Sequence, residues 1–232
     1  SPDPSGIAYL PHTQSLLIAD GEVDEMAVYF TGKNVFVSSL GGALTGTLTT
    51  LTYSYEPTGA AYNPVNRHVF YTDDNWKRVF EVNPGADGRF NSSDDIVTYF
   101  STTAFGGTDP EGIAYNPANG HLFIADGLGE EIYEVSPGAN GIFDGVAPAG
   151  DDIATHFDTT ALSLRDPESV EFNPDNGTLY ILSWLSNRIA ETTTSGVVLN
   201  YIDITAIGGR AEAGIAYAPS SVDPLRMSLY IV

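Results

Sequence analysis

Short apolar runs of four to seven residues alternate along the whole chain with segments rich in glycine, proline and asparagine. The runs are rich in valine, isoleucine, tyrosine, phenylalanine and threonine, and no stretch of ten residues shows a convincing helical period. Apolar runs of this length and composition, separated by turn-forming residues, are typical of β-strands. The pattern therefore predicts an all-β protein.

One motif recurs five times and divides the chain into similar units. Its fullest copy reads Asp-Pro-Glu-Gly-Ile-Ala-Tyr-Asn-Pro over residues 109–117, and weaker copies begin at Asp3, Glu56, Asp166 and Glu212. Each copy is followed by a second apolar run, and the first four are also followed by a third and a fourth. Four strands in a repeat of about 50 residues are typical of a blade that buries its faces by stacking around an axis. We therefore predict a β-propeller of four-stranded antiparallel blades, with the motif on the innermost strand.

The number of blades stays open between five and six, because the fifth unit stops after its second strand. We favour five blades with a truncated last blade, in one domain over residues 1–232. The blades are expected over about 3–55, 56–108, 109–165, 166–211 and, in part, 212–232. In the first blade, the fourth strand is expected over residues 48–53. Open sheet edges in an incomplete blade favour self-association through that blade.

The composition bounds the function. The chain has 30 acidic and 9 basic residues, a net charge of −21, and 42% hydrophobic residues, which is enough for a core. Nucleic-acid binding and anionic membrane surfaces are excluded because both need clustered lysine and arginine. No apolar run is long enough to span a bilayer, and no leader precedes Ser1. We therefore expect a mature domain of a secreted or cell-surface protein.

The 232 residues include no cysteine, which excludes disulfides, thiolate metal sites and a cysteine nucleophile. No Gly-x-Ser-x-Gly elbow, His-Glu-x-x-His motif or phosphate-binding glycine loop occurs either. Carboxylates are therefore the side chains that carry the candidate chemistry.

The loops between the third and fourth strands of the second and third units are acidic and rich in glycine. Calcium takes six to eight oxygen ligands, and glycine allows the tight curvature that such loops need. The alternative is an ordinary hairpin loop in which Asp and Asn form Asx-turns. The candidate calcium ligands are Asp87, Asn91, Asp94, Asp95, Asn140, Asp144, Asp151 and Asp152.

A second acidic cluster follows from the topology. Antiparallel strands place the loop before the first strand and the loop after the second strand on one face of the ring. That face gathers Asp3, Asp20, Glu56, Asp73, Asp109, Glu111, Asp126, Asp166 and Glu168. Such a cluster could hold a divalent cation, lower the pKa of its bound water and support hydrolysis. The alternative is that acids recurring in each repeat cap loops without a metal.

The preferred ligands at this channel mouth are Asp109, Glu111, Asp126, Asp166 and Glu168. Glu111 and Glu168 come first because they replace Ser5 and Thr58 of the other repeats. The two tryptophans, Trp76 and Trp184, also lie on this face, where they could stack a sugar or an organic cation. Packing between blades is the alternative.

The string from Asp109 to Asp126, continued by Glu131-Ile132-Tyr133, resembles an NHL-type repeat. It has the proline, the Gly-Ile-Ala core, an Asn-Pro, an apolar strand that ends in Ala-Asp, and then a charged residue before Ile-Tyr. The resemblance covers nearly the whole chain and implies a propeller fold, on which lactonases, lyases and pure binding modules all occur. The chain is also similar to calcium-dependent lactonase propellers, which hold a metal at the axis.

Two functions therefore stay open. We favour a secreted calcium-binding module that binds a protein or carbohydrate ligand without catalysis. The alternative is a metal-dependent hydrolase of the lactonase or phosphotriesterase kind, with its metal at the acidic channel mouth.

Overall fold

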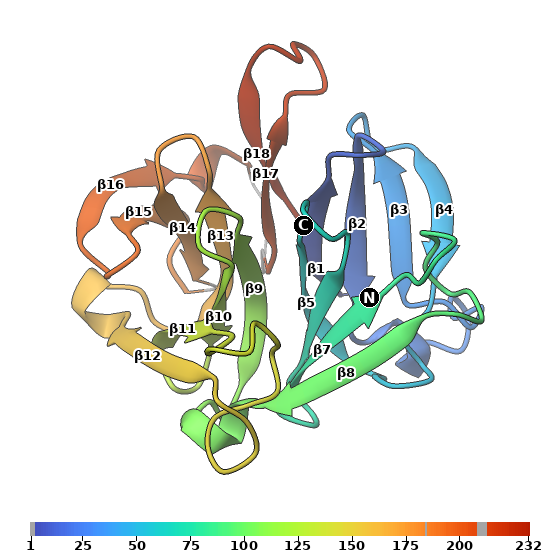
Figure 1. Ribbon diagram of the computed structural model, residues 1–232. Helices are drawn as coiled ribbons and strands as arrows, with labels where there is room; N and C mark the ends of the chain where they lie inside the picture. The colour runs from blue at the N-terminus through green and yellow to red at the C-terminus, as the bar shows by residue number, and fades with distance from the viewer. Residues whose placement is uncertain (1–2, 184, 208–212) are drawn as a thin grey trace.

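The computed structural model describes residues 3–183, 185–207 and 213–232. They form four antiparallel four-stranded sheets and one two-stranded sheet around a central axis (Figure 1). The all-β propeller with four-stranded blades is therefore confirmed. Trp184, one of the two candidate stacking residues, lies outside the described residues, as does Glu212 at the start of the fifth motif.

Each of the four complete blades takes its strands in sequence order from the axis outward. Blade 1 contains β1 (Pro4–Leu10), β2 (Ser15–Asp20), β3 (Val35–Ser39) and β4 (Leu44–Leu48). Blade 2 contains β5 (Pro57–Tyr62), β6 (Val69–Asp73), β7 (Arg78–Asn83) and β8 (Ile96–Ser101). Blade 3 contains β9 (Pro110–Asn116), β10 (His121–Asp126), β11 (Glu131–Ser136) and β12 (Ile153–Asp158). Blade 4 contains β13 (Pro167–Asn173), β14 (Thr178–Ser183), β15 (Arg188–Thr193) and β16 (Val198–Asp203).

The fifth sheet consists of β17 (Ile215–Pro219) and β18 (Met227–Ile231), so the described residues form four full blades rather than five or six. This sheet closes the ring between blades 4 and 1 (Figure 1). Ile215 packs with Leu182 and Ile189 of blade 4, and Ala216 packs with Ile7 of blade 1. Apolar burial on both sides therefore holds the two-stranded sheet in place of a complete blade.

The fourth strand of blade 1 differs from the prediction, since β4 ends at Leu48 and residues 49–54 form a turn. The backbone N–H groups of Tyr53 and Ser54 both donate to the carbonyl oxygen of Thr50, at 2.8 Å each. The buried Thr50 hydroxyl accepts a hydrogen bond of 2.8 Å from the Asn34 side chain. These bonds curl the segment, so its apolar residues pack in a turn.

Four 3-10 segments complete the secondary structure of the described residues: Val23–Glu25 (η1), Thr102–Phe105 (η2), Thr160–Leu162 (η3) and Thr205–Ile207 (η4). The last three lead from the outer strand of one blade toward the next blade. No helical segment in the described part of the chain has the length and apolar character that a membrane crossing requires.

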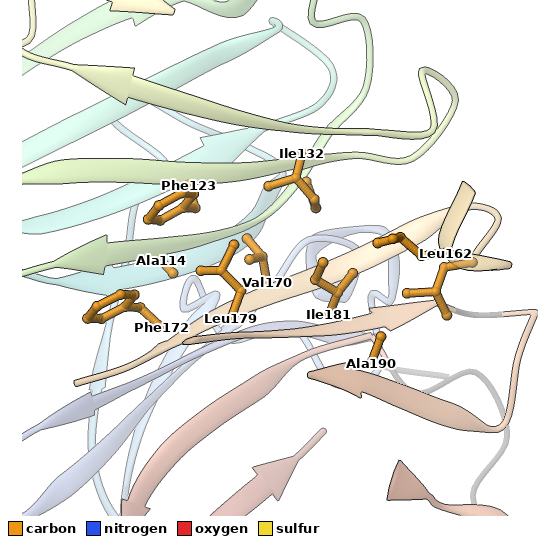
Figure 2. Packing of buried hydrophobic residues seen from close by; sticks show 11 residues of the cluster. Ala114, Phe123, Ile132, Leu162, Val170, Phe172, Leu179, Ile181 and Ala190 are labelled. Carbon is orange, nitrogen blue, oxygen red and sulfur yellow. The ribbon is translucent and has the colours of Figure 1, made fainter. Parts of the chain in front are cut away.

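The core lies between neighbouring blades rather than at the axis. Figure 2 shows the cluster between blades 3 and 4, where Phe123 and Phe172 stack with ring centroids 6.3 Å apart. Ile132 and Ile181, from the same two blades, are completely buried. Each fully buried side chain of this size contributes about 1.5–3 kcal/mol. The blades therefore form a stiff frame around the axis.

A ring of small residues brings the inner strands together. A Cβ atom on Gly112 would lie 2.5 Å from the Ser169 Cα atom of the next blade. A Cβ on Gly59 would lie 2.5 Å from the Glu111 carbonyl oxygen, and one on Gly214 would lie 2.5 Å from the Ser5 carbonyl oxygen. Backbones therefore touch from blade to blade, and one cavity lies at each end of the inner strands.

Replacement of Gly112 by alanine should lower the free energy of unfolding by about 1–3 kcal/mol, because the new methyl group meets backbone atoms that cannot move independently. Gly41→Ala is the matched control, since its Cβ would meet a single atom, Ser39 Oγ, at 3.8 Å. Chemical denaturation of both variants measures the effect. Equal stabilities of the two variants would contradict the close approach at the axis.

Candidate functional site

The acidic cavity opens where the inner strands begin and has a volume of about 330 Å³. Its walls come from the loops before the inner strands and the loops after the second strands, as the antiparallel topology requires. The acidic residues that line it are Asp3, Glu22, Glu56, Asp74, Asp109, Glu111, Asp166 and Glu168. The structure thus brings together Asp109, Glu111, Asp166 and Glu168 of the predicted mouth.

A β-bulge at the start of each inner strand of the four full blades aims a side chain into this cavity. In blade 1, Pro4 pairs with Asp20 and Gly6 pairs with Ala19, which leaves Ser5 as the extra residue. The same register shift occurs at Thr58, Glu111 and Glu168. An extra residue bends the strand and redirects its side chain. The two bulges that carry glutamate therefore supply two carboxylates to the mouth.

Several carboxyl groups lie close together at the mouth, and two of them are largely buried. Burial, followed by the neighbouring Glu168, raises the pKa of Glu111 to about 9. Burial, followed by Asp166 and other acids, raises the pKa of Glu168 to about 8. The Lys77 ammonium lies 3.5 Å from the Oδ1 atom of Asp109. Protons or a bound cation would relieve the repulsion among these carboxylates.

Asp74, Asp109 and Glu111 form the tightest part of the mouth, with one carboxylate oxygen from each within 4.8 Å of the others. The Asp74 Oδ1 atom is buried and has no hydrogen-bond partner in the described structure. Asp74 is not among the residues predicted from the sequence. Its signal was its position directly after Asp73, at the end of the second strand.

The acid that ends the second strand has a structural role in blades 1 to 3. Asp126 is fully buried and accepts the backbone N–H groups of Thr108 at 2.5 Å and Gly129 at 2.7 Å. Asp73 accepts the Ser54 hydroxyl at 2.6 Å in the same way. These carboxylates hold the loops that form the mouth. Asp126, which was predicted as a mouth ligand, is therefore buried and is not among the residues that line the cavity.

The acids of the blade 2 loop are occupied by hydrogen bonds of that loop. Asp94 accepts the backbone N–H of Ala86 at 2.8 Å and the hydroxyl of Ser92, whose hydrogen bond lowers the pKa of Asp94. Asp95 accepts the N–H of Asn91 at 2.7 Å. The Asn91 amide also donates to the Thr49 carbonyl oxygen of blade 1 at 2.8 Å. Asp87 caps the same turn through the N–H of Arg89, at 2.8 Å.

The blade 3 loop gathers its acids more tightly. One carboxylate oxygen from each of Asp144, Asp151 and Asp152 lies within 4.8 Å of the other two. Asp152 is 6% exposed, its Oδ2 atom accepts the Gly145 N–H at 2.8 Å, and its Oδ1 atom is buried without a partner. Burial raises the pKa of Asp152. This loop therefore holds a buried oxygen that lacks a donor.

The other candidate ligands of this loop take part in hydrogen bonds of the loop itself. Asn140 donates its side-chain N–H to Asp144 Oδ2 at 3.0 Å, and Asp151 accepts the backbone N–H of Ala139 at 2.9 Å. A Cβ atom on Gly150 would overlap Asp144 Oδ1, at 1.7 Å. This loop has four more residues than that of blade 2, at positions 146–149, which we call the insert. Val146 of the insert forms a β-bridge with Asp152, so the insert packs against the acids of the loop.

Trp76 lies in an exposed aromatic patch of blade 2, with 44% of its surface accessible. Its ring is 6.5 Å from that of Tyr55, and the Arg78 guanidinium lies 5.3 Å above it. The same guanidinium lies 4.2 Å above Tyr99. The chain's own arginine thus already provides the cation–π contact at this tryptophan.

The model of one protein family, described as SdiA-regulated, matches residues 3–218. No curated protein sequence matches the chain. Among solved structures, the glutaminyl cyclase of Myxococcus xanthus is similar with a TM-score of 0.64 at 16% identity, over 100% of this chain and 92% of that one.

Two further structures are similar at low identity. A chain of a nidogen–laminin complex gives a TM-score of 0.57 at 18% identity, over 92% of this chain and 68% of that one. The virginiamycin B lyase of Staphylococcus aureus gives 0.53 at 13% identity, over 98% and 69% of the two chains. At these identities the likeness shows the propeller fold alone.

In metal-free buffer, the thermal stability should fall as the pH rises from about 5 to about 9. The unfolded chain releases the protons of Glu111 and Glu168 near the ordinary value of 4.5, whereas the folded protein keeps them until about pH 9 and 8. The stability from the protonated forms is therefore complete below pH 4.5 and is lost as the pH passes the folded values. Melting temperatures across this range measure the effect.

The variant Glu111→Gln, which is neutral at every pH, should show a smaller fall than the wild type. Glu25→Gln, which removes the same charge at an exposed residue, should keep the wild-type fall. A fall of equal size in Glu111→Gln and the wild type would rule out Glu111 as its source.

Proposed function

This chain belongs to the SdiA-regulated family, a family of β-propellers, and we propose that it is a calcium-binding propeller module that binds a ligand or partner without catalysing a reaction. We place it outside the cell, secreted or at the cell surface, as a propeller of five units. The buried, partnerless Oδ1 atom of Asp152 is the observation that carries the calcium proposal.

The blade 3 loop has the donor chemistry that calcium prefers. Asp144, Asp151 and Asp152 offer carboxylate oxygens, and the Asn140 side chain and backbone carbonyls offer neutral ones. A buried acceptor without a donor costs about 1–3 kcal/mol, and a bound cation removes that cost. When bound, calcium would supply positive charge and cross-link the two ends of the insert.

The blade 2 loop is the weaker candidate, although it has the same acidic pair. Asp94 and Asp95 already accept several hydrogen bonds from their own loop, and Asp94 is exposed. Burial of the second aspartate distinguishes the two loops: Asp152 is covered by the insert, whereas Asp95 is partly exposed. We therefore assign the main calcium site to blade 3.

A binding role fits the rest of the molecule. One similar structure is a chain of a complex between nidogen and laminin, which supports protein binding on this fold. Carbohydrate is the other ligand class that we propose. The outer edge of β18 pairs with no further strand among the described residues, so self-association would take place there.

Metal-dependent hydrolysis at the channel mouth is the second candidate. Asp74, Asp109 and Glu111 form a second three-carboxylate cluster, and it opens into a cavity of about 330 Å³ that has room for a substrate. A divalent cation held there would lower the pKa of a bound water. Glu168, beside this cluster, would then be positioned to hold or release a proton.

Calcium should raise the melting temperature of the wild-type protein, because it binds the folded loop and not the unfolded chain. At about 100 times the Kd the stabilisation is about 2.7 kcal/mol. For a protein of this size that corresponds to a rise of about 5–10 °C. Asp152→Asn should abolish most of the rise, since the amide keeps the acceptor for Gly145 and loses the charge. Calorimetry with and without calcium measures it.

Asp95→Asn in blade 2 is the matched control and should keep the calcium-dependent rise. An unchanged rise in Asp152→Asn would contradict the blade 3 site. If Glu111→Gln abolished the rise instead, the cation would belong to the channel mouth.

The non-catalytic role predicts no hydrolysis above the buffer rate. We expect none with lactones, aryl esters or phosphotriesters, in the presence of calcium, manganese or zinc. Metal-dependent turnover that Glu168→Gln abolishes and Asp152→Asn preserves would support the hydrolase instead. Stopped-flow or continuous colorimetric assays with the two variants measure this difference.

A further inference from the structure

A second cavity lies at the opposite end of the inner strands from the acidic mouth and has a volume of about 220 Å³. The acidic mouth is lined by residues at the start of the inner strands, such as Ser5 and Thr58, whereas this cavity is lined by residues near their ends. The ring of glycines at Gly6, Gly59 and Gly112 lies between the two sets of residues. The two cavities are therefore separate sites on one axis.

Five aromatic side chains, one from each of the five innermost strands, line this second cavity. They occupy the same position of the repeat, three residues after the glycine or serine of the axial ring. The five are Tyr9, Tyr62, Tyr115, Phe172 and Tyr217. We call this set the aromatic ring of the axis.

Contacts with the surrounding blades hold these side chains in place. The Tyr217 hydroxyl donates to Asp175 Oδ2 at 2.7 Å, and the Tyr62 hydroxyl lies 3.0 Å from His12 Nδ1. Tyr115 stacks on Phe70 with ring centroids 6.0 Å apart. Side chains fixed before binding lose little conformational entropy when a ligand arrives. The aromatic ring is therefore preorganised.

A single carboxylate, that of Glu171, interrupts this apolar wall. The other four repeats have alanine at the corresponding position, namely Ala8, Ala61, Ala114 and Ala216. The Glu171 Oε1 atom accepts the backbone N–H of Tyr217 at 2.9 Å, which fixes the carboxylate between blade 4 and the fifth sheet. No lysine or arginine occurs among the described residues that line the cavity. An acid at the axis is therefore placed among aromatic rings without a basic partner.

We propose that this cavity binds a small organic ammonium ion, held between the carboxylate of Glu171 and the aromatic ring of the axis. Aromatic faces attract cations through their quadrupole, and quaternary ammonium groups are recognised by cages of such rings. A calcium ion would need six to eight oxygen ligands, whereas this wall offers one carboxylate among apolar groups. A cavity of about 220 Å³ has room for a small organic cation.

Choline and its uncharged isostere, 3,3-dimethylbutan-1-ol, test the proposal with the wild-type protein. The two molecules have nearly the same shape, so their difference in affinity isolates the charge. Isothermal titration at pH 9 is suitable, since burial raises the pKa of Glu171 to about 8. We expect choline to bind at least tenfold more tightly than the isostere. Equal affinity, or no binding of choline, would overturn the proposal.

The variant Glu171→Gln tests the assigned carboxylate. The amide oxygen can still accept the Tyr217 N–H, while the charge is lost, so we expect choline affinity to fall at least tenfold. Glu25→Gln makes the same change in net charge at an exposed residue and should leave affinity unchanged. An equal fall in both variants, or no fall in Glu171→Gln, would overturn the assignment.

Two further readouts keep the test decisive. Circular dichroism and melting temperature establish that Glu171→Gln is folded, and if it is not, the comparison of choline with its isostere on the wild type decides alone. Calcium and chelator should leave choline affinity unchanged, because no residue that lines this cavity belongs to the blade 3 loop or to the acidic mouth. Loss of choline binding in chelator would place the ligand at a metal instead.

Discussion

The close approach of the inner strands at the axis is the constraint on which the rest of the structure depends. Glycine at positions 6, 59, 112 and 214, and serine at 169, let neighbouring backbones touch. Any larger residue would push the blades apart and open the apolar clusters between them, where most of the burial lies. The same approach fixes the bulged residue before each small residue, so its side chain is aimed at the mouth. One packing requirement thus sets the blade spacing and the position of the site.

The candidate functional residues lie at positions where one repeat differs from the others. Acids that recur in the repeat form hydrogen bonds within the fold. Asp126, for example, accepts two backbone N–H groups of its loops. Glu111 and Glu168 replace smaller residues at the bulge, and Glu171 replaces an axial alanine. The insert of the blade 3 loop buries Asp152. These departures add burial and charge that the fold itself does not require, which is why we assign function to them.

The sequence predicts the fold well because a propeller repeats its strands at a fixed period, and it predicts the acidic mouth because antiparallel connections force two sets of loops onto one face. It fails where the outcome depends on side-chain burial. Asp126 and Asp109 are both acidic loop residues in the sequence, yet Asp126 points inward and Asp109 lines the cavity. The end of β4 at Leu48 depends on the turn anchored at Thr50. The aromatic ring of the axis appears in the sequence only as the recurring aromatic residue of the motif, which is also typical of an ordinary strand.

Carboxylates in excess of basic side chains lie at both ends of the axis, but their surroundings differ. With 30 acids and 9 bases, the chain cannot neutralise its carboxylates internally, and two of its arginines, Arg78 and Arg188, lie over aromatic rings. At the mouth, many oxygens share the charge, an environment suited to a hard cation or to protons. At the other end, one carboxylate lies among aromatic rings, an environment suited to a soft, poorly hydrated cation. A cation that binds only the folded state adds its binding free energy to the stability of that state. Because the carboxylates are in excess, the stability of this fold depends on the cations that they bind.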